Sequence, residues 1–545
     1  MLPKTSQLPS IPEDTKRVAE AAFKKGNICV DLQKHIGNLF EDNDFIELYP
    51  KMGKPSIPPW RLATVLILQY MEGATDRRAA EFVRSRIDWK YVLRLPLDDP
   101  GFAHTALTKF RKRMVENDKE RLIFDCILEK LGTTGLLEEN GPQRTDSTHI
   151  LGAIRTLNRI ECVGEALRSV LNAIAVVDIA WLRKYIPKDW FERYEHSFSD
   201  YHLPKDTEKR EKLAHQLGKD GFQILSWLNT SDEGEYLSRI PSVKTLEKIL
   251  EQNYEKKKEV RWKKNREMPK SSEQIRSPYE TEVRQGKKRK HRWNGYKVHI
   301  TESCSEGKPR LVTNVETTMA TVNDSEVVER IHENLKERGI HPLKHIVDRG
   351  YISAELLVKS KSDYNIDLLG PAKKETGWQT KIEGGITQSM FTFDWEQNQV
   401  ICPKGARAKL NKITNCNGKT RNQAEFRKSV CALCEFQERC KKSEVKGRVL
   451  QVLPKEELEV LKKRREEQET RRFQDEFSIR AGVEGVHHVL CNTMKMRKSR
   501  YRGIKKVTLQ HHLTAAALNV KRAVCSKQGI SLATSSQPRF MEALV

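Results

Sequence analysis

Two aspartates lie at the ends of short segments that we expect to be strands. Asp348 follows Val347 in the string IVDRGYIS, and Asp146 stands in the string RTDSTHI. An unpaired carboxylate is costly to bury, whereas ligands of an α/β sheet gather beyond the carboxyl ends of its strands. Two carboxylates on neighbouring strands would repel each other unless a cation bridged them, and Mg²⁺ prefers such hard oxygen ligands. The pair therefore predicts a magnesium site.

A third acid, Glu484, lies in the string FSIRAGVEGVHHVL. Phe477, Arg480 and Glu484 are spaced to share one face of a helix. Gly482 and Gly485 beside the acid each cost a helix roughly 1 kcal/mol relative to Ala, so we expect another backbone to approach closely there. Two-metal phosphodiester chemistry needs a further acid, which Glu484 could supply. Taken alone, Glu484 is also compatible with an ordinary solvated glutamate.

A cysteine-bearing segment at 375–455 separates the second aspartate from the glutamate. Its candidate metal ligands are Cys402, Cys431, Cys434 and Cys440. A CxxC pair with two further cysteines can complete a tetrahedral zinc site, although unligated or redox-sensitive thiols would give the same pattern. The segment has few large apolar residues, and structural zinc supplies folding free energy directly. The segment is therefore a candidate zinc lobe.

The elements that must position these residues belong to a basic chain. Its 545 residues carry a formal net charge of +24, which favours a nucleic-acid partner. No apolar run approaches the roughly 18 residues of a membrane span, and eleven cysteines fit a reducing compartment better than a disulfide scaffold. We expect a cytoplasmic protein that binds DNA and no membrane.

Hydrophobic periodicity divides the chain into helical and mixed regions. After a loosely ordered lead at 1–30, the pattern at 31–118 is helical, and helical spacing returns between 151 and 270. Residues 254–293 are rich in Lys and Arg, as in a linker or a phosphate-facing arm. Between 290 and 372 strand-like and helical patterns alternate, which predicts an α/β layer.

Basic residues with spacing suited to DNA occur in two places. Arg111 and Arg113 lie on the flank of a helix in the N-terminal region, where backbone contact or a solvated face is expected. The string MRKSRYRGIKK places Arg497, Arg500 and Arg502 around a tyrosine, a combination that suits a grip on the DNA backbone with stacking.

Several separate strings resemble the DDE transposases of bacterial insertion sequences. They are RTDSTHI, WNGYKVHITE, VDRGYIS, IRAGVEGVHHVL and RYRGIKKVTLQHHLTAAALNVKR. The pair WRLATVLILQYMEG and FRKRM resembles the subgroup with an N-terminal helical domain. The likeness runs over most of 35–525.

The resemblance implies a fold and a site. The fold would be α/β, with a ribonuclease H-like catalytic domain at 140–525, a helical DNA-binding domain at 31–118, insertions at 151–275 and 375–455, and a tail at 526–545. Asp146, Asp348 and Glu484 would bind two Mg²⁺ ions, with Mn²⁺ able to substitute. The partners would be the terminal inverted repeats of the element and target DNA, bound by a homo-oligomer.

The chain departs from its relatives around the third acid. Many relatives have a Tyr, Arg, Glu, Lys series there, whereas this chain has Phe477 and Cys491 at the Tyr and Lys positions. Lys495 or Arg497, one turn further on, could replace the missing lysine, beside Arg480.

The leading hypothesis is a transposase that cuts and joins the ends of its own element. A nuclease without strand transfer, or a catalytically idle DNA-binding protein descended from a transposase, are the alternatives.

Overall fold

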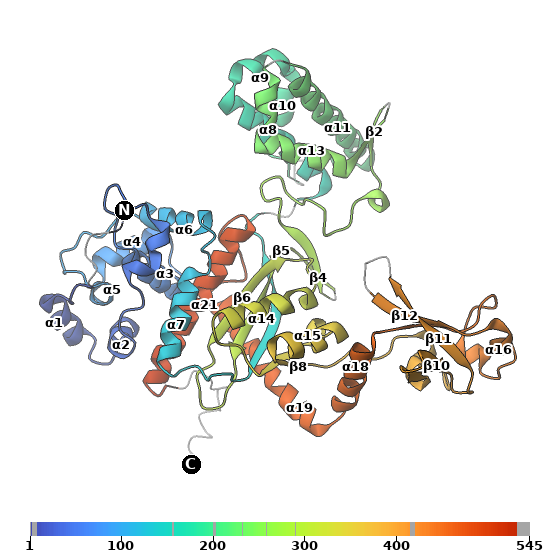
Figure 1. The fold of residues 1–545 in the computed structure, drawn as a ribbon. Helices are drawn as coiled ribbons and strands as arrows, with labels where there is room; N and C mark the ends of the chain where they lie inside the picture. The colour runs from blue at the N-terminus through green and yellow to red at the C-terminus, as the bar shows by residue number, and fades with distance from the viewer. Residues whose placement is uncertain are drawn as a thin grey trace.

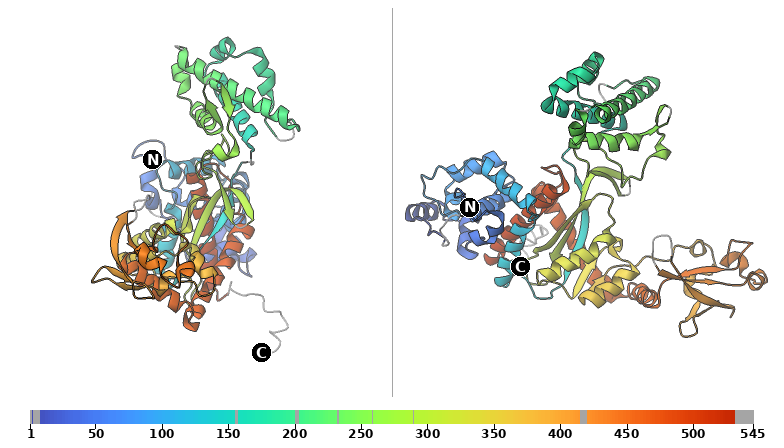
Figure 2. Two further views of the ribbon diagram at one scale, coloured as in Figure 1. Left: turned by 90° about the vertical axis from the view of Figure 1, so that its right-hand side faces the viewer. Right: turned by 45° about the horizontal axis from the view of Figure 1, so that its top comes forward.

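The computed structural model describes residues 2, 8–154, 157–199, 203–231, 233–257, 259–288, 290–414 and 420–530. The structure is mixed α/β, with a central sheet joined to helices at the N-terminal side, a helical lobe and a β-rich lobe (Figure 1). The helical lobe is called the helical insertion only for its place in the chain between two strands of the central sheet. The helical insertion and the β-rich lobe project from the central sheet in different directions (Figure 2). Within the described ranges, no helix is long and apolar enough to cross a membrane.

The central sheet has six strands in the order β4-β5-β1-β7-β8, with β6 also paired to β5. Its strands are β1 (Gln143–Leu151), β4 (Arg284–Lys288), β5 (His291–Ser303), β6 (Val312–Met319), β7 (Lys344–Val347) and β8 (Asp367–Leu369). Strand β1 is central, antiparallel to β5 and parallel to β7, and β8 is parallel to β7. The alternation predicted for 290–372 is confirmed.

Helices cover both faces of this sheet. The elements on one face are η3 (Asp324–Val327), α14 (Val328–Glu337), η4 (Arg349–Tyr351) and α15 (Ala354–Tyr364). The helical elements of the C-terminal part of the chain are α18 (Lys455–Glu467), α19 (Arg471–Ser478), η7 (Ile479–Gly482), α20 (Val483–His488), the π-helical turn η8 (Val489–Thr493) and α21 (Ile504–Lys527). Helix α21 is buried over most of its length and shares one hydrophobic core with β1, β5, β6 and the N-terminal helices. A separate core lies between α14, α15 and β7.

The N-terminal region is helical, as predicted, and packs directly on α21. Its elements are α1 (Glu13–Ala22), α2 (Ile28–His35), η1 (Asp42–Leu48), α3 (Pro59–Glu72), α4 (Asp76–Ser85), α5 (Ile87–Val92), α6 (Thr105–Glu116) and α7 (Leu122–Thr133). Helix α3 begins with Pro59 at its first turn and ends at Gly73, whose φ of 66° is left-handed.

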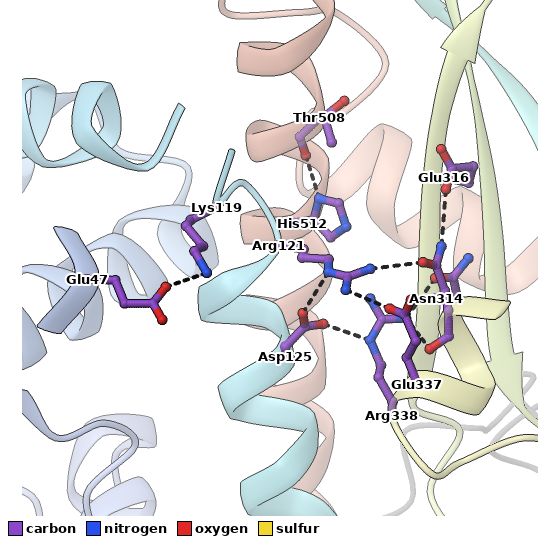
Figure 3. Close-up of polar contacts among 11 residues, drawn as sticks. Glu47, Lys119, Arg121, Asp125, Asn314, Glu316, Glu337, Arg338, Thr508 and His512 are labelled. Atoms are coloured by element: carbon purple, nitrogen blue, oxygen red, sulfur yellow. Dashed lines mark hydrogen bonds and ion pairs between the residues drawn. The ribbon is translucent and has the colours of Figure 1, made fainter. Parts of the chain in front are cut away.

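Polar contacts add to this packing between α7 and the sheet (Figure 3). Arg121 donates to Glu337 at 2.7 Å, and Arg338 donates to Asp125 at 2.7 Å and to Asn314 at 2.8 Å. These bonds connect α7, the end of α14 and β6. The N-terminal helices are therefore fixed to the central sheet by both apolar and charged contacts.

The expected loosely ordered lead at 1–30 is wrong from residue 13 onward, because α1 is a regular helix there. Thr15 is fully buried and its hydroxyl donates to the Leu95 carbonyl oxygen at 2.8 Å, which fixes α1 against the helices that follow. Residues 1 and 3–7 lie outside the described residues. The tail predicted at 526–545 begins inside α21, and residues 531–545 also lie outside the described part.

The helical insertion has its own hydrophobic core. It comprises α8 (Arg159–Val177), α9 (Ile179–Tyr185), α10 (Lys188–Glu195), α11 (Thr207–Thr230), α12 (Gly234–Ser238), α13 (Pro241–Asn253), β2 (Tyr254–Lys256), β3 (Val260–Trp262) and η2 (Asn265–Glu267). Trp181 and Trp190 are buried in that core, as anchoring residues should be.

The β-rich lobe is a five-stranded antiparallel sheet with short helices. Its elements are η5 (Trp378–Lys381), η6 (Gln388–Met390), β9 (Thr392–Asp394), β10 (Gln399–Ile401), β11 (Arg407–Thr414), β12 (Thr420–Glu425), α16 (Lys428–Ala432), α17 (Gln437–Cys440) and β13 (Val449–Val452). Phe391, Val400, Phe426 and Val452 are buried together. The few large apolar residues expected in this segment are nevertheless enough for a core, since strand alternation gathers them on one face.

A buried charge cluster connects the sheet to the C-terminal helices. Arg144 on β1 is 1% exposed and donates to Glu302 on β5 at 2.9 and 2.5 Å. Its remaining nitrogen donates to the Ile479 carbonyl oxygen in η7. Arg522 on α21 donates to the other oxygen of Glu302 at 3.1 Å. One buried carboxylate thus neutralises two arginines from different elements.

Replacing Glu302 with glutamine should therefore destabilise the fold. Removing one partner of a buried ion pair typically costs about 3–5 kcal/mol, because a buried charge is left uncompensated. The thermal unfolding midpoint, followed by circular dichroism, should fall clearly in Glu302→Gln. Glu306→Gln, at an exposed position four residues further on, is the control. Equal midpoints for the two variants would contradict the role given to Glu302.

Candidate active site

The carboxylates of Asp146 and Asp348 come from neighbouring parallel strands. In the β1–β7 pair Thr145 lies opposite Val347, so each aspartate follows the last paired residue in the same register. Adjacent strands are about 4.8 Å apart, and side chains in register point to the same face. The charge of Asp348 also acts on the pKa of Asp146. The structure therefore brings two of the three predicted acids together.

Asp146 occupies a partly buried position with cations around it. Its side chain is 17% exposed, and Arg480 donates to its Oδ2 at 3.2 Å. Its Oδ1 accepts the backbone N–H of Ser147 at 2.7 Å. Burial raises the pKa of Asp146 above its ordinary value, against the opposing effects of Ser147, Lys288 and Arg480. A further cation at this carboxylate would favour its charged form.

Asp348 is exposed and serves as the cap of the following turn. Its side chain accepts the backbone N–H of Arg349 at 2.8 Å, at the start of η4. The Asp348 carboxylate is therefore not buried, which explains why an acid can directly follow the buried residues Ile346 and Val347. Its remaining oxygen is accessible at the strand end.

Glu484 is exposed on α20, and α20 packs against β1. Arg480, four residues earlier on the same helical segment, reaches Asp146, so Glu484 lies on the same side of the sheet as that acid. Among the described residues, however, no group of three or more His, Cys, Asp or Glu side chains is arranged to hold a metal ion. The third acid is near the pair without completing a closed site.

The two glycines beside Glu484 have different surroundings. A Cβ at Gly482 would come within 2.1 Å of the Arg144 guanidinium, whereas a Cβ at Gly485 would meet nothing within 4 Å. The expectation of a closely approaching backbone is therefore wrong at both positions. Gly482 makes room for a charged side chain, and Gly485 borders open space.

A polar network that sequence reasoning missed lies on the face of the sheet opposite to Asp146 and supports the acid pair from there. Lys297 donates to Asp324 at 2.9 Å, and His299 shares a 2.8 Å hydrogen bond with the Tyr351 hydroxyl. Burial lowers the pKa of His299 to about 3, so its ring is neutral. Burial, together with the charges of Asp324 and Asp146, raises the pKa of Tyr351, which stays a phenol. Strand alternation could have placed Lys297 and His299 on one face; nothing local predicts Asp324.

The two arginines of the N-terminal region that are predicted to contact DNA differ in how accessible they are to a ligand. Arg111 is buried, forms an ion pair with Asp76 and lies over the Tyr501 ring. Its expected DNA contact is replaced by a structural role, because Asp76 neutralises it inside the fold. Arg113 is partly exposed, with its guanidinium 4.3 Å from the centroid of the Tyr49 ring.

The basic residues after Glu484 that are candidates for DNA contact also differ in their exposure. Arg497 donates to the Thr148 hydroxyl at 2.7 Å and to the His149 carbonyl oxygen at 2.5 Å, which attaches its loop to β1. Arg500 lies 4.8 Å from the Tyr70 ring centroid. Lys495 and Arg502 are exposed. The exposed pair is thus better placed than Arg497 to meet a ligand.

The residues that depart from the family pattern pack inside the protein. Phe477 stacks on Phe473 at 5.9 Å between centroids, and Cys491 is buried. His487 is also buried, and burial lowers its pKa to about 4, which leaves a neutral ring packed near Asp146. The buried position of His487 is therefore that of a packing residue.

The four predicted zinc ligands line one cavity of about 360 Å³, although among the described residues no three of them are arranged to hold a metal ion. They are Cys402, Cys431, Cys434 and Cys440. Burial raises the pKa of the Cys440 thiol, Arg448 lowers it, and the other three thiols raise it, so all four interact electrostatically. The backbone N–H of Arg448 also donates to Sγ of Cys431 at 3.5 Å. Cys416 of the same segment, which the sequence also offers as a possible zinc ligand, lies outside the described part of the chain.

Two segments match models of known protein families. Residues 401–524 match a model described as a transposase DDE domain, and residues 17–113 match one described as a transposase domain of the DUF772 type. The first match includes Glu484 and the cysteine cavity, and the second covers α1 to α6. A comparison with curated proteins gives no match. Both matches are consistent with a DDE transposase of the insertion-sequence type.

The two glycines beside Glu484 allow a matched test of this site. Gly482→Ala should lower the thermal unfolding midpoint, because the new methyl group displaces Arg144 from bonds to Glu302 and Ile479, at a cost of about 1–3 kcal/mol. Gly485→Ala should leave the midpoint unchanged or raise it, since Ala favours a helix by roughly 1 kcal/mol. If Gly482→Ala were as stable as Gly485→Ala, the close packing at Arg144 would be refuted.

Proposed function

We propose that this protein cleaves and joins DNA at the ends of its own insertion sequence by two-metal-ion phosphodiester chemistry. The two family matches indicate a transposase. The single observation that carries the chemical proposal is the register of the two aspartates, since each directly follows the paired residues Thr145 and Val347. Asp348 follows the end of β7, whereas Asp146 is the fourth residue of β1 and not a strand-end residue as expected. Hard oxygen ligands in that arrangement suit Mg²⁺, with Mn²⁺ able to substitute.

The strand order supports a ribonuclease H-like core. A central strand with an antiparallel neighbour on one side and parallel strands on the other carries the first acid, and the next parallel strand carries the second. Helix α20 carries the third acid against the same strand. We assign the catalytic domain to 140–525 and regard the helical and β-rich parts as insertions at 151–275 and 375–455.

The chain's own residues have separate tasks in this proposal. Asp146 and Asp348 are the first two metal ligands, and Glu484 is the candidate for the third. Arg480 donates to Asp146 at 3.2 Å and so neutralises its charge, while Glu484 remains outside the pair. Bound metal ions would activate the attacking oxygen and stabilise the leaving one. The exposed Lys495 and Arg502 are candidates for contact with the DNA backbone.

Asp348→Asn should abolish cleavage while leaving DNA binding nearly unchanged. Loss of a metal ligand removes an interaction needed in the transition state, and we expect cleavage to fall by at least about 10²–10³-fold. The test incubates the protein and Mg²⁺ with duplexes that carry the DNA flanking its gene, and measures cut and joined products by gel electrophoresis.

Asp363→Asn is the control, because Asp363 is exposed on α15 away from the strand ends. Cut products without joined products from the unaltered chain would favour a nuclease. Full activity of Asp348→Asn would remove Asp348 from the active site, and an inactive unaltered chain that still binds DNA would favour the idle DNA-binding protein.

We also propose that the cysteine cavity binds one structural Zn²⁺. Zinc binds thiolates, and the four thiols line one cavity in which the backbone N–H of Arg448 donates to Sγ of Cys431. The Arg448 charge opposes the burial that raises the pKa of Cys440. The apolar core of the lobe means that zinc would add to existing order. Unligated or redox-active thiols remain the alternative.

Metal analysis of the purified chain should give about one zinc per molecule. The double variant Cys431→Ser/Cys434→Ser should lose this zinc, because two of four thiolates are removed. Cys525→Ser, on α21 outside the cavity, should retain it. Zinc far below one per unaltered chain, or zinc retained by the double variant, would reject the site.

A further inference from the structure

The β4–β5 hairpin carries a concentration of positive charge beside the acid pair. We call Lys287, Lys288, Lys290 and Arg292 together the basic hairpin; all four are exposed. Lys287 lies directly opposite Arg292, and Lys288 lies opposite His291. Like charges directly opposite each other destabilise an antiparallel pair. The fold therefore holds charges together that would be more stable apart.

Packing beneath the hairpin keeps these charges in place. The Trp293 ring lies over Gly286, where a Cβ would come within 2.3 Å of the ring. Trp293 is only 6% exposed, and its Nε1–H donates to the Tyr296 carbonyl oxygen at 3.0 Å. The exposed His291 ring lies parallel to Trp293, at 6.3 Å between centroids. The four cations are thus held on a well-packed two-stranded hairpin.

The cations of the basic hairpin form no direct ion pairs in the part of the chain that the structure describes. Over the residues that the structure describes, none of its four cations forms an ion pair with an acid, whereas exposed cations elsewhere do, such as Lys359 with Glu329 and Arg261 with Glu255. An unpaired cluster of this kind attracts a polyanion.

The hairpin stands at the end of the strand that carries Asp146. The His149 ring, three residues after that acid, lies 4.9 Å from the His291 ring and 5.4 Å from the Trp293 ring between centroids. The charge of Lys288 acts on the carboxylate of Asp146. Figure 1 shows β4 beside β5 at the border of the sheet. A backbone gripped there would pass close to the acid pair.

We propose that the basic hairpin binds the phosphodiester backbone of the DNA strand that is presented to Asp146 and Asp348. The proposal rests on the proposed function for its DNA substrate, and it names the surface that positions that substrate. Contact with phosphates neutralises the facing cations and removes their mutual repulsion. The hairpin is a positioning element, and the acids remain the catalytic residues.

Neutralising the basic hairpin should weaken DNA binding specifically. The hairpin variant carries Lys287→Gln, Lys288→Gln, Lys290→Gln and Arg292→Gln. Its affinity for a fluorescent duplex of about 40 base pairs of arbitrary sequence is measured by anisotropy at several salt concentrations. Each lost phosphate contact lowers the slope of log affinity against log salt by about 0.9, so a decrease of about 2–4 is expected, with binding at least tenfold weaker near 0.15 M salt.

The control variant removes four exposed cations of the helical insertion that also have no ion pair in the described structure: Lys188→Gln, Lys219→Gln, Lys244→Gln and Lys248→Gln. Its net charge change is the same, so an equal loss of affinity in both variants would overturn the proposal, as would an unchanged hairpin variant. Replacing the three hairpin lysines with arginine should preserve binding.

Stability provides a second reading of the same variants. Because like-charge pairs are removed, the thermal unfolding midpoint of the hairpin variant should stay the same or rise. The proposal would be overturned if the hairpin variant bound DNA more weakly and unfolded at a lower midpoint, and if arginine replacement restored neither the binding nor the midpoint. Binding is measured without cleavage, so an unaltered chain that binds DNA through the hairpin but does not cut it would reject the catalytic function alone.

Discussion

The buried cluster of Arg144, Glu302 and Arg522 is the constraint on which the candidate site depends. A guanidinium that is 1% exposed needs partners for all its donors. Glu302 supplies one partner from β5, and the Ile479 carbonyl oxygen supplies another from η7. The second oxygen of Glu302 binds Arg522 on α21. One strand, its neighbour and two C-terminal helical segments are thereby fixed relative to one another across more than 300 residues of sequence.

The geometry of the acids follows from this cluster. Asp146 lies two residues after Arg144 and so on the same face of β1. Arg480 directly follows the residue whose carbonyl binds Arg144, and it therefore reaches Asp146 at 3.2 Å. Gly482 admits the guanidinium, so the helix can approach the strand at the required distance. Glu484 is carried to the same side as a consequence, while its final approach to the pair depends on its own side chain.

Local sequence predicts part of this arrangement and not the rest. The strand ending at Val347 and the helix around Arg480 are predictable, because apolar runs and periodicity are local signals. The pairing of β1 with β7 is not, since 202 positions separate Thr145 from Val347. Arg111 was expected on the surface because basic residues are usually exposed; its partner, Asp76, lies 35 positions away. The core of the β-rich lobe was missed because each short strand contributes only one or two apolar residues.

Under the proposed function, the charges around Asp146 would make metal binding and DNA binding depend on each other. An acid pair repels an incoming phosphate, and the unpaired cations of the β4–β5 hairpin repel each other, so each set is incomplete alone. A metal ion at the acids would lower the repulsion felt by a phosphate, and a phosphate at the hairpin would add negative charge beside the metal. Because binding free energies are reciprocal, whatever affinity metal adds for DNA, DNA adds for metal. Under the proposed function, this coupling would follow from the neighbouring positions of the two sets, because His149, three residues after Asp146 on β1, packs its ring 4.9 Å from the His291 ring of the hairpin.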